Sequence, residues 1–424
     1  MRTNSAGEGR TGMRVVVVGG GIGGLALGAG LRRRGFEVSV FDRDTDVAAT
    51  GGYHITLDGR ARSALRELVP PDFERRLLAS ASALRLRDRD ALWDRRGRLL
   101  GHGPDLGGSA GVDVDRVTLR VLLAEAVGGD LHLGRPVSGV ERGPDGTPRV
   151  LFADAAPVAA DLVVGADGAH SVVARHLAGG PTNRPAGLIG FSGRTLVEDL
   201  SPGERRRLGP RSGLVVGPRG AALYIGFLDP VGKPALDAPE LRMSVTTGPT
   251  YIWGAMFPES TATDALRPLR EGALGAALLS RFRERGWAGR TLEVIARADP
   301  HSVAAYRFNA ASTRASDLAP WPAGTITALG DAVHATPPTA GMGAGAAIRD
   351  AADLVAHLSD AAAGATTLTA AVARFEAGMR RRGGEALTLA MRTVRLILAT
   401  DTALGAAATA LTTPLLAAAT RLRH

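Results

Sequence analysis

The chain of 424 residues has no cysteine, and Lys233 is its only lysine. A chain without cysteine forms no disulfide, has no thiol nucleophile and ligates no iron–sulfur cluster through cysteine. Metal spacing is missing too, because none of the nine histidines forms an H-x-x-x-H pair or a similar motif. The sequence therefore predicts a protein without a metal site.

Aromatic residues are scarce, at 4% of the chain, although the net charge is +9. Arginine supplies nearly all the positive charge, in short runs at residues 32–34, 205–207 and 380–382 that contain no aromatic residue. Nucleic-acid surfaces combine a basic stripe with aromatic side chains on which bases stack. We therefore interpret the runs as solvated helix faces and expect no nucleic-acid partner.

The N-terminus lacks an apolar segment suited to secretion. Residues 1–12 carry glycine and charge, which predicts a disordered arm and a cytoplasmic protein. Residues 402–420 carry no charge and are just long enough to span a membrane. Because alanine and threonine are frequent there and Pro414 interrupts the run, we expect a helix packed on the body of the protein or at a dimer contact, and no membrane partner. A monomer and a homodimer both remain open.

A strand, a glycine turn and a helix are predicted near the start of the chain. Residues 15–18 form a continuous apolar run, which is typical of a buried parallel strand. Gly19, Gly21 and Gly24 follow in the spacing G-x-G-x-x-G, which allows a tight turn, close approach of a pyrophosphate and close helix packing. The free amide groups of the helix N-terminus then point at the phosphates. This unit predicts dinucleotide binding.

An acidic residue follows the next predicted strand, at residues 37–41. Asp42 stands directly after that strand, with Arg43 next to it. A carboxylate here accepts hydrogen bonds from the hydroxyl groups of an adenosine ribose, which favours an unphosphorylated ribose, as in FAD or NAD. The first motif does not separate these two cofactors.

Two further strand-and-turn motifs occur later in the chain. Residues 161–171 hold a strand that runs into an Asp-Gly pair at Asp167. Residues 325–351 hold a strand that runs into Asp331, then a glycine loop at 341–345 that opens a helix. In this order and at this spacing, the three motifs predict one FAD held by three distant parts of the chain.

With these motifs, residues 13–385 resemble the class A flavoprotein monooxygenases of the aromatic-hydroxylase type. The resemblance implies that Arg116, in an R-x-x-L sequence with Leu119, lies against the flavin. It implies that Asp167 takes part in FAD and pyridine-nucleotide handling, and that Asp331 binds the ribityl hydroxyl groups.

The family's glycine loop directs backbone amides at the flavin O2 and N1 region, where the helix dipole stabilises negative charge on the reduced flavin. The matching residues here are Gly341, Met342, Gly343 and Ala344. This sequence departs from the family pattern at three positions: Ala174 replaces an arginine, Ala335 a proline and Gly345 an asparagine.

Together the resemblance and the element pattern predict an α/β (α+β) fold, with a Rossmann-like FAD-binding domain, a mixed β-sheet substrate domain and C-terminal helices. The expected ranges are 13–79, 111–183 and 300–385 for the FAD-binding domain, 80–110 and 184–299 for the substrate-binding domain, and 386–424 for the C-terminal helical segment. Alternating residues in the substrate half predict strands at 187–196, 213–217, 221–229, 241–247 and 251–258, followed by a helix near 273–285.

Candidate substrate-binding residues come from this half and from segments beside the flavin motifs. They are Tyr53, His54, Phe191, Arg194, Tyr224, Trp253, Met256 and Pro337. Alternation along a strand sends Trp253 and Met256 to opposite faces, so the two cannot both face the flavin. No catalytic acid–base pair stands out, and His334 belongs to the flavin motif rather than to a catalytic base.

The resemblance implies a monooxygenase that uses NADPH or NADH and O2. In that family a flavin C4a-hydroperoxide passes one oxygen atom to an aromatic ring, an alkene or a ketone, and the protein orients the substrate. Residues 41–57 are similar to flavoenzymes that inactivate tetracyclines and to hydroxylases that tailor polycyclic natural products. The expected substrate is therefore a small aromatic or polycyclic molecule.

Other functions remain open from the sequence. A related FAD-dependent reductase or dehydrogenase would carry the same motifs, and so would a non-catalytic flavoprotein partner of another enzyme. A hydrolase is a different class, suggested by G-x-S-x-G around Ser109. That motif needs a strand before the serine and a helix after it, whereas Ser109 is preceded by glycines and a proline, so we interpret the segment as a loop.

Overall fold

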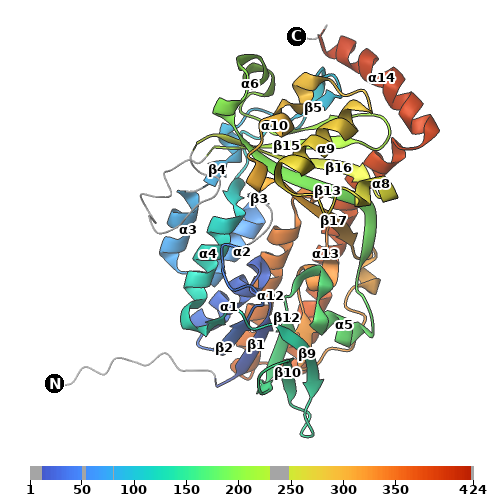
Figure 1. The fold of residues 1–424 in the computed structure, drawn as a ribbon. Coiled ribbons are helices and arrows are strands. Elements are labelled where there is room, and N and C mark those ends of the chain that lie inside the picture. The colour runs from blue at the N-terminus through green and yellow to red at the C-terminus, as the bar shows by residue number, and fades with distance from the viewer. Residues whose placement is uncertain (1–11, 50–53, 80, 230–247, 422–424) are drawn as a thin grey trace, which may run out of the picture.

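A parallel sheet forms the centre of the cofactor half of the protein. The computed structural model describes residues 12–49, 54–79, 81–229 and 248–421. The strand order is β18-β12-β1-β2-β8, with parallel neighbours throughout (Figure 1). The strands are β1 Arg14–Val18, β2 Glu37–Phe41, β8 Leu131–His132, β12 Leu162–Gly165 and β18 Ile326–Ala328. The predicted Rossmann-like fold is confirmed.

The two faces of this sheet are covered by different elements. Val15 and Val17 of β1 belong to the core that includes the helices, whereas Val16 and Val18 pack with Val150 of a small antiparallel sheet. This alternation is the reason why β1 has no polar residue between Val15 and Val18. The covering helices are α1 Ile22–Arg33, α4 Arg116–Val127 and α12 Gly343–Ala362, and the small sheet consists of β9 Val137–Arg142, β10 Pro148–Phe152 and β11 Val158–Ala159.

A mixed sheet of seven strands forms the second half and lies above the first sheet in Figure 1. Its order is β17-β13-β16-β15-β14-β5-β6. The strands are β5 Ala91–Asp94, β6 Leu99–His102, β13 Arg184–Leu196, β14 Gly213–Val216, β15 Ala222–Leu228, β16 Thr250–Pro258 and β17 Ala304–Ala310. One face packs on α9 Glu271–Arg283 and α10 Glu293–Ala296, and the other turns towards the cofactor half.

Four of the strands predicted in this half correspond to β13, β14, β15 and β16, and the helix predicted near 273–285 is α9. The strand predicted at 241–247 lies outside the described residues. β17 falls inside the range 300–385 predicted for the FAD-binding domain, but it pairs antiparallel with β13. The physical reason is that β13 is long and β17 satisfies the backbone groups of its free edge.

A third, short sheet connects the two halves. It consists of β3 His54–Leu57, β7 Val112–Asp115 and β4 Ala81–Ala83, with the order β3-β7-β4. The remaining helices are α2 Gly59–Leu68, α3 Pro71–Leu78, α5 Val172–Ala178, α6 Pro202–Leu208, α8 Thr261–Asp264, α11 Asp331–His334, α13 Leu368–Ala399 and α14 Ala403–Arg421.

A buried charge network joins α11, α12 and α13. His334 Nε2 lies 2.6 Å from Asp350 Oδ2, and both side chains are fully buried. Arg382 Nε donates to Asp350 Oδ1 at 2.9 Å. Burial alone would lower the pKa of the His334 imidazole, but the Asp350 carboxylate more than offsets this and raises that pKa above its ordinary value. His334 is therefore a structural anchor of the segment that carries Asp331.

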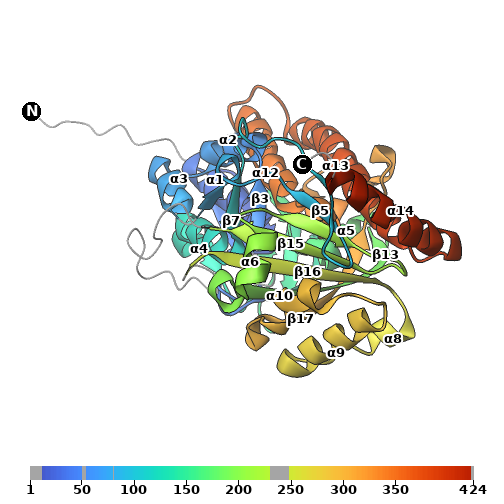
Figure 2. The ribbon, with the colours of Figure 1, turned by 90° about the horizontal axis from the view of Figure 1, so that it is seen from above.

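The C-terminal helix α14 contacts the body of the protein at β6 but is mostly exposed, and the alternative of a dimer contact stays a prediction. It projects at the side of the molecule in both ribbon views (Figures 1 and 2). The stretch Ala403–Thr420 is long and apolar enough to cross a membrane, and only 6% of it is buried. It packs on β6, where Thr420 Oγ1 donates to the Leu100 carbonyl at 3.1 Å, and Ala417 is a buried residue of the helix.

We predict that Asp350→Asn lowers the free energy of unfolding by about 3 kcal/mol, because it leaves Arg382 and His334 without their shared carboxylate. In the wild type, the stability from the raised His334 pKa is complete below about pH 6.5 and is lost as pH rises through the folded-state pKa. Asp350→Asn should abolish this pH dependence. Urea unfolding at several pH values measures both effects, with Asp360→Asn on the exposed face of α12 as the control. Equal stability of Asp350→Asn and the wild type would contradict the anchor role.

Candidate cofactor and substrate site

The first glycine turn is shaped by contact with the second motif. Gly19 has φ +109°, and a Cβ there would lie 2.4 Å from the Ala166 carbonyl oxygen. A Cβ on Gly24 would lie 1.9 Å from the Gly19 oxygen. By contrast, a Cβ on Gly21 would meet nothing within 4 Å. Two of the glycines are thus required by the fold, and Gly21 borders open space at the N-terminus of α1, where a pyrophosphate fits.

Asp42 and a buried arginine hold this turn in place. The Gly20 amide donates to Asp42 Oδ2, and the Asp44 amide donates to Asp42 Oδ1 at 2.7 Å. Arg120 donates from Nε to the Gly20 carbonyl at 2.9 Å and forms an ion pair with Asp44 at 2.8 Å. Asp42 therefore positions the glycine turn, and its contact with a ribose stays a prediction. Arg43 is exposed next to it.

Arg120 is a site residue that none of the sequence motifs singles out. It lies four residues after Arg116 on α4, so the two arginines share one face of the helix. The signal was present, because the sequence reads R-x-x-L-R. A charged residue that is almost never buried without partners is here buried among two carboxylates and a carbonyl.

Asp167 of the second motif accepts hydrogen bonds at the start of α5, whose N-cap residue is Ser171. Ser171 Oγ donates to Asp167 Oδ1, and the Val172 amide donates to Asp167 Oδ2 at 2.7 Å. Burial raises the pKa of the Asp167 carboxyl. Its Cα lies 2.7 Å from where a Cβ on Gly19 would stand. The structure thus brings Asp167 to the glycine turn, while its contact with a cofactor stays a prediction.

Asp331 of the third motif is exposed to solvent, but protein atoms surround much of its carboxyl group. The resulting desolvation raises the pKa of this carboxyl. Arg116 is close enough to stabilise its negative charge. A Cβ on Gly343 would lie 3.7 Å from Asp331 Oδ1, and a Cβ on Gly341 would lie 3.7 Å from Thr56 Oγ1. The glycine loop, with Met342 and Ala344, therefore lies between the acidic residue and strand β3.

The first and third motifs also meet directly. A Cβ on Gly23 would lie 3.0 Å from both the Ala347 Cβ and Leu329 Cδ1, so α1 packs closely on α12 at this glycine. Gly21 and Asp331 each lie two residues from this contact, and the charge of Arg116 acts on Asp331, so the three residues border one region. The donors, acceptors and space present fit FAD: amides for the pyrophosphate, a carboxylate for the ribityl hydroxyls and a loop of amides for the flavin.

The candidate substrate residues divide between the two faces of the large sheet. His54 stacks on Tyr224 with 6.2 Å between ring centroids, and Tyr224 and Met256 lie on the face towards the cofactor half. Arg194 lies on the same face and forms a 2.6 Å ion pair with Asp299. Pro337 is buried just ahead of the glycine loop.

Phe191 and Trp253 are not brought to this face. Both are fully buried in the other core, between the sheet and α9. Residues at odd positions of β13 and β16 point there, so the prediction that these two residues bind substrate is wrong. The prediction that Trp253 and Met256 point to opposite faces is confirmed. Tyr53 lies outside the described residues.

A buried charge network behind His54 was not foreseen. His54 Nε2 lies 3.5 Å from Asp113 Oδ1, and Arg87 donates to Asp113 Oδ2 at 2.8 Å. Burial alone would raise the pKa of the Asp113 carboxyl, but His54, Arg87 and the Thr56 hydroxyl together hold it below its ordinary value. Asp113 therefore stays ionised and fixes the imidazole of His54. No sequence motif joins Arg87 to Asp113, because the pairing crosses between β7 and the loop before β5.

A cavity of about 380 Å³ opens beside the second motif. Four arginines and a histidine line it: Arg175, Arg184, Arg267, Arg307 and His170. The arginine missing at Ala174 is thus accompanied by Arg175 one position later, and Ala174 itself is buried in the core. Ser109 lies in the loop between β6 and β7, so the strand and helix that a hydrolase motif needs do not flank it.

These features define a flavoprotein, and comparisons with known proteins give its family. Residues 17–60 match the model of the NAD(P)-binding Rossmann-like domain, and residues 286–373 match that of the FAD binding domain. The aurachin C monooxygenase/isomerase of Stigmatella aurantiaca is 31% identical over 377 residues, covering 87% of this chain and 85% of that protein. The FAD-dependent urate hydroxylase of Mycolicibacterium vanbaalenii is 26% identical, covering 80% and 78%.

Solved structures agree on the fold. Klebsiella pneumoniae HpxO, crystallised with FAD and uric acid, has a TM-score of 0.70 and 23% identity, covering 91% of this chain and 88% of that one. The chain belongs to the FAD-dependent monooxygenases of the aromatic-hydroxylase type (class A). The predicted cofactor FAD and the predicted enzyme class are thereby confirmed.

We predict that Gly21→Val folds but does not retain FAD. The new side chain has room in the chain alone, since a Cβ there meets nothing within 4 Å, but it fills the space in front of the α1 amides. The ratio of flavin to protein absorbance in the purified protein measures this. Gly203→Val is the matched control, because a Cβ there also meets nothing within 4 Å and the residue lies on α6. Full FAD retention by Gly21→Val would remove the pyrophosphate from this position.

We predict that Asp331→Ala weakens FAD binding about 10- to 100-fold, because it removes a charged hydrogen-bond acceptor from an enclosed site. Fluorescence titration of the FAD-free protein with FAD gives the dissociation constant. The thermal midpoint of the FAD-free protein should change little, since Asp331 is solvent-accessible and makes no ion pair shorter than 4 Å among the described residues. An unchanged dissociation constant would reject the role assigned to Asp331.

Proposed function

We propose that the protein is an NAD(P)H- and O2-dependent hydroxylase of a flat, hydroxylated aromatic or fused-ring molecule. The observation that carries this is that β3 joins the two groups: a Cβ on Gly341 of the glycine loop would lie 3.7 Å from Thr56 Oγ1, and His54 of the same strand stacks on Tyr224. FAD bound there supplies electron transfer from the reductant and activation of oxygen. The residues of the chain then decide which substrate is oriented and how its proton is handled.

The substrate class is supported by the sheet face that turns to the cofactor half. Gly254 lies opposite Tyr224 on β16, and a Cβ there would meet only the Tyr224 Cβ, at 3.9 Å. A surface of tyrosine, methionine and glycine suits a planar ring. Relatives named for urate and for 3-amino-4-hydroxybenzoate act on such rings, which supports the same class here.

His54 is the residue that we assign to the substrate proton. Its Nε2 faces the ionised Asp113, so the imidazole is held in one orientation beside Tyr224. A neutral imidazole accepts a proton from a phenolic hydroxyl, and Asp113 stabilises the imidazolium that results. The deprotonated ring is more electron-rich and accepts an oxygen atom more readily. Asp113 and Arg87 are positioning residues in this account.

The arginine-lined cavity beside Asp167 is where we place the phosphates of the reductant. Among the residues that the structure describes, Arg267 and Arg307 form ion pairs with Asp264, which orders them at the cavity. The positive charge attracts the phosphates of a dinucleotide at long range. The sequence has no second glycine fingerprint to retain the dinucleotide, so its binding is transient. We keep the cytoplasm as the proposed compartment.

Purified holoprotein tests the proposal. NADPH or NADH oxidation and oxygen uptake are followed with hydroxylated one- and two-ring aromatics, and ¹⁸O2 is used to trace the product. Substrate-stimulated uptake with one ¹⁸O atom in the product is the expected result. Reductant oxidation without incorporated oxygen would favour the reductase or dehydrogenase, and no turnover with any ring would favour the non-catalytic partner.

We predict that His54→Gln lowers the hydroxylation rate about 100-fold with a phenolic substrate, because no base then accepts the proton of the substrate's phenolic hydroxyl. The loss should shrink as pH approaches the phenol pKa, where the substrate ionises by itself. FAD content should not change. His301→Gln, at an exposed histidine, is the control. A pH-independent loss, or no loss, would contradict the proton role and leave His54 a packing residue.

A further inference from the structure

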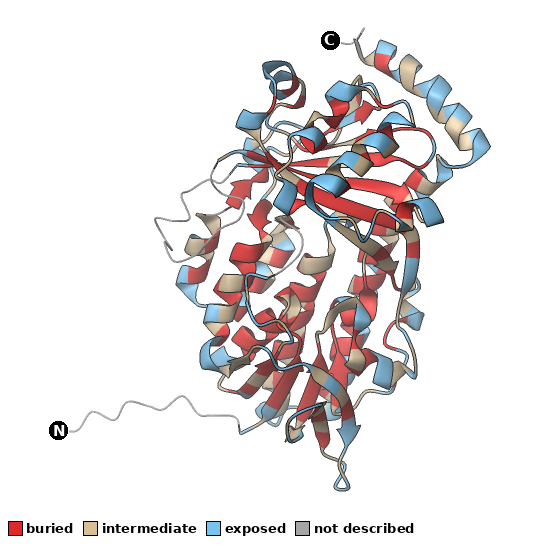
Figure 3. Cartoon of the chain, viewed as in Figure 1, coloured by how far each residue is buried: buried red, intermediate tan, exposed pale blue. Residues whose placement is uncertain are grey.

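Four leucines along the C-terminal helix α14 are exposed to solvent. Leu404, Leu411 and Leu415 are 85%, 70% and 71% exposed, and Leu416 is exposed as well. Seven- and four-residue spacing places Leu404, Leu411 and Leu415 on one stripe. Figure 3 shows the helix largely exposed or intermediate, in contrast to the buried strands beside it. Isolated exposed leucines are ordinary, but a stripe of this length marks an interaction site.

A concentration of arginines adjoins the start of this helix. Arg95 donates from Nη1 to the Arg285 carbonyl at 3.2 Å, and Arg285 donates from Nε to the Arg219 carbonyl at 3.3 Å. The Arg219 amide in turn donates to the Thr400 carbonyl at 2.9 Å, three residues before α14 begins. The three arginines are therefore joined to the base of the helix by direct contacts.

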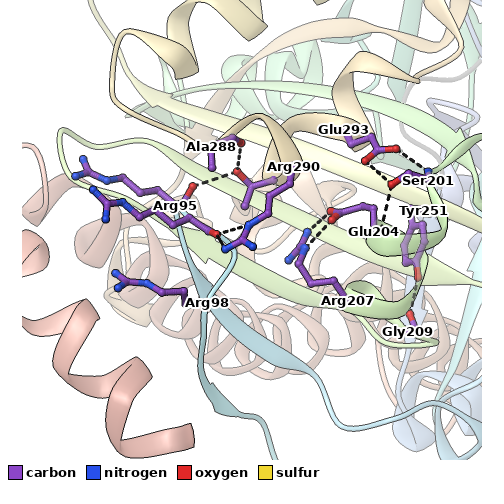
Figure 4. A network of polar contacts seen from close by, with 12 residues as sticks. Arg95, Arg98, Ser201, Glu204, Arg207, Gly209, Tyr251, Ala288, Arg290 and Glu293 are labelled. Carbon is purple, nitrogen blue, oxygen red and sulfur yellow. Dashed lines mark hydrogen bonds and ion pairs between the residues drawn. The ribbon is translucent and has the colours of Figure 1, made fainter.

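The cluster continues along the turn between β5 and β6, the strand on which α14 packs. Arg96 is exposed there, and Arg98 forms an ion pair with the buried Asp94 at 2.6 Å. Figure 4 shows the side chains of Arg95 and Arg98 extending to the same side, away from the Arg207–Glu204 pair.

Positive charge exceeds negative charge around these arginines. Burial lowers the pKa of Arg95, and repulsion from Arg96 and Arg219 lowers it further. The acidic groups nearby are Asp94, Glu284 and Asp401, of which Glu284 pairs with Arg281 at 3.2 Å. Arginines packed this closely repel one another, so an anionic surface placed against them is stabilised.

From this juxtaposition we propose that α14 and the arginines at its base dock the protein on the surface of an anionic lipid bilayer. The leucine stripe enters the boundary between headgroups and acyl chains, and Arg95, Arg96 and Arg219 contact the lipid phosphates. The chemistry required of the partner is an apolar interior beneath a layer of negative charge.

Two features favour a bilayer surface over other occupants. A second copy of this chain in a two-fold dimer would bring an identical arginine cluster towards the first, at a net charge of +9 per chain. Insertion across the bilayer would break the packing of Ala417 and the Thr420–Leu100 hydrogen bond on β6. A helix that lies flat keeps both contacts.

Vesicle flotation with the full-length FAD-bound protein tests the proposal. The vesicles contain phosphatidylcholine alone or with about 30% phosphatidylglycerol. We expect binding to the anionic vesicles, little binding to the neutral ones, and release by about 0.5 M NaCl. Leu411→Glu/Leu415→Glu and, separately, Arg96→Glu/Arg219→Glu should each lower the bound fraction about tenfold or more.

Matched controls separate docking from misfolding. Leu86→Glu removes another exposed leucine, and Arg34→Glu reverses an exposed arginine at the end of α1; both should bind vesicles as the wild type does. Every variant should keep its FAD content and thermal midpoint. Absence of wild-type binding, or equal binding by all variants, would overturn the proposal. So would a wild-type dimer that ignores vesicles and becomes a monomer in Leu411→Glu/Leu415→Glu, which would assign the stripe to a second copy.

Discussion

The site depends on the direct backbone contact between the Gly19 turn and the end of β12. At this point the chain comes so close to itself that a Cβ on Gly19 would overlap Ala166 and Asp167. A second close approach, of Gly23 to Ala347, brings α12 against α1. Three segments more than a hundred residues apart can share one cofactor because glycine removes the side chains that would separate them.

Buried charged side chains then fix how the elements around the site are placed relative to one another. Arg120 holds the glycine turn to α4, Asp350 joins α11 to α13, and Asp113 fixes His54 against the large sheet. Each of these charges is paired and hydrogen-bonded, as a buried ion must be. A half-satisfied network would cost more than an apolar core, so these groups allow one relative placement of the elements that they join.

The charges on the surface are less completely paired than those in the interior. The enclosed site collects one carboxylate and one arginine for a bound cofactor, whereas the far edge of the large sheet collects arginines without enough acidic partners. Next to them stands α14, which carries no charge between Ala403 and Thr420. The same chain therefore presents a polar, enclosed region for small molecules and an open, cationic and apolar surface for a large partner.

The sequence by itself determined the local units: the strand-turn-helix at Gly19, the positions of β13 to β16, and the three motifs that identify a flavoprotein. These depend on a period of two or on glycine spacing, which neighbouring residues set. Only the tertiary structure decided that Phe191 and Trp253 face the other core, that Arg120 and Asp113 support the site, that β17 joins β13, and that α14 stands outside the body. Those outcomes depend on which distant element packs against which face, and local periodicity carries no information about the partner.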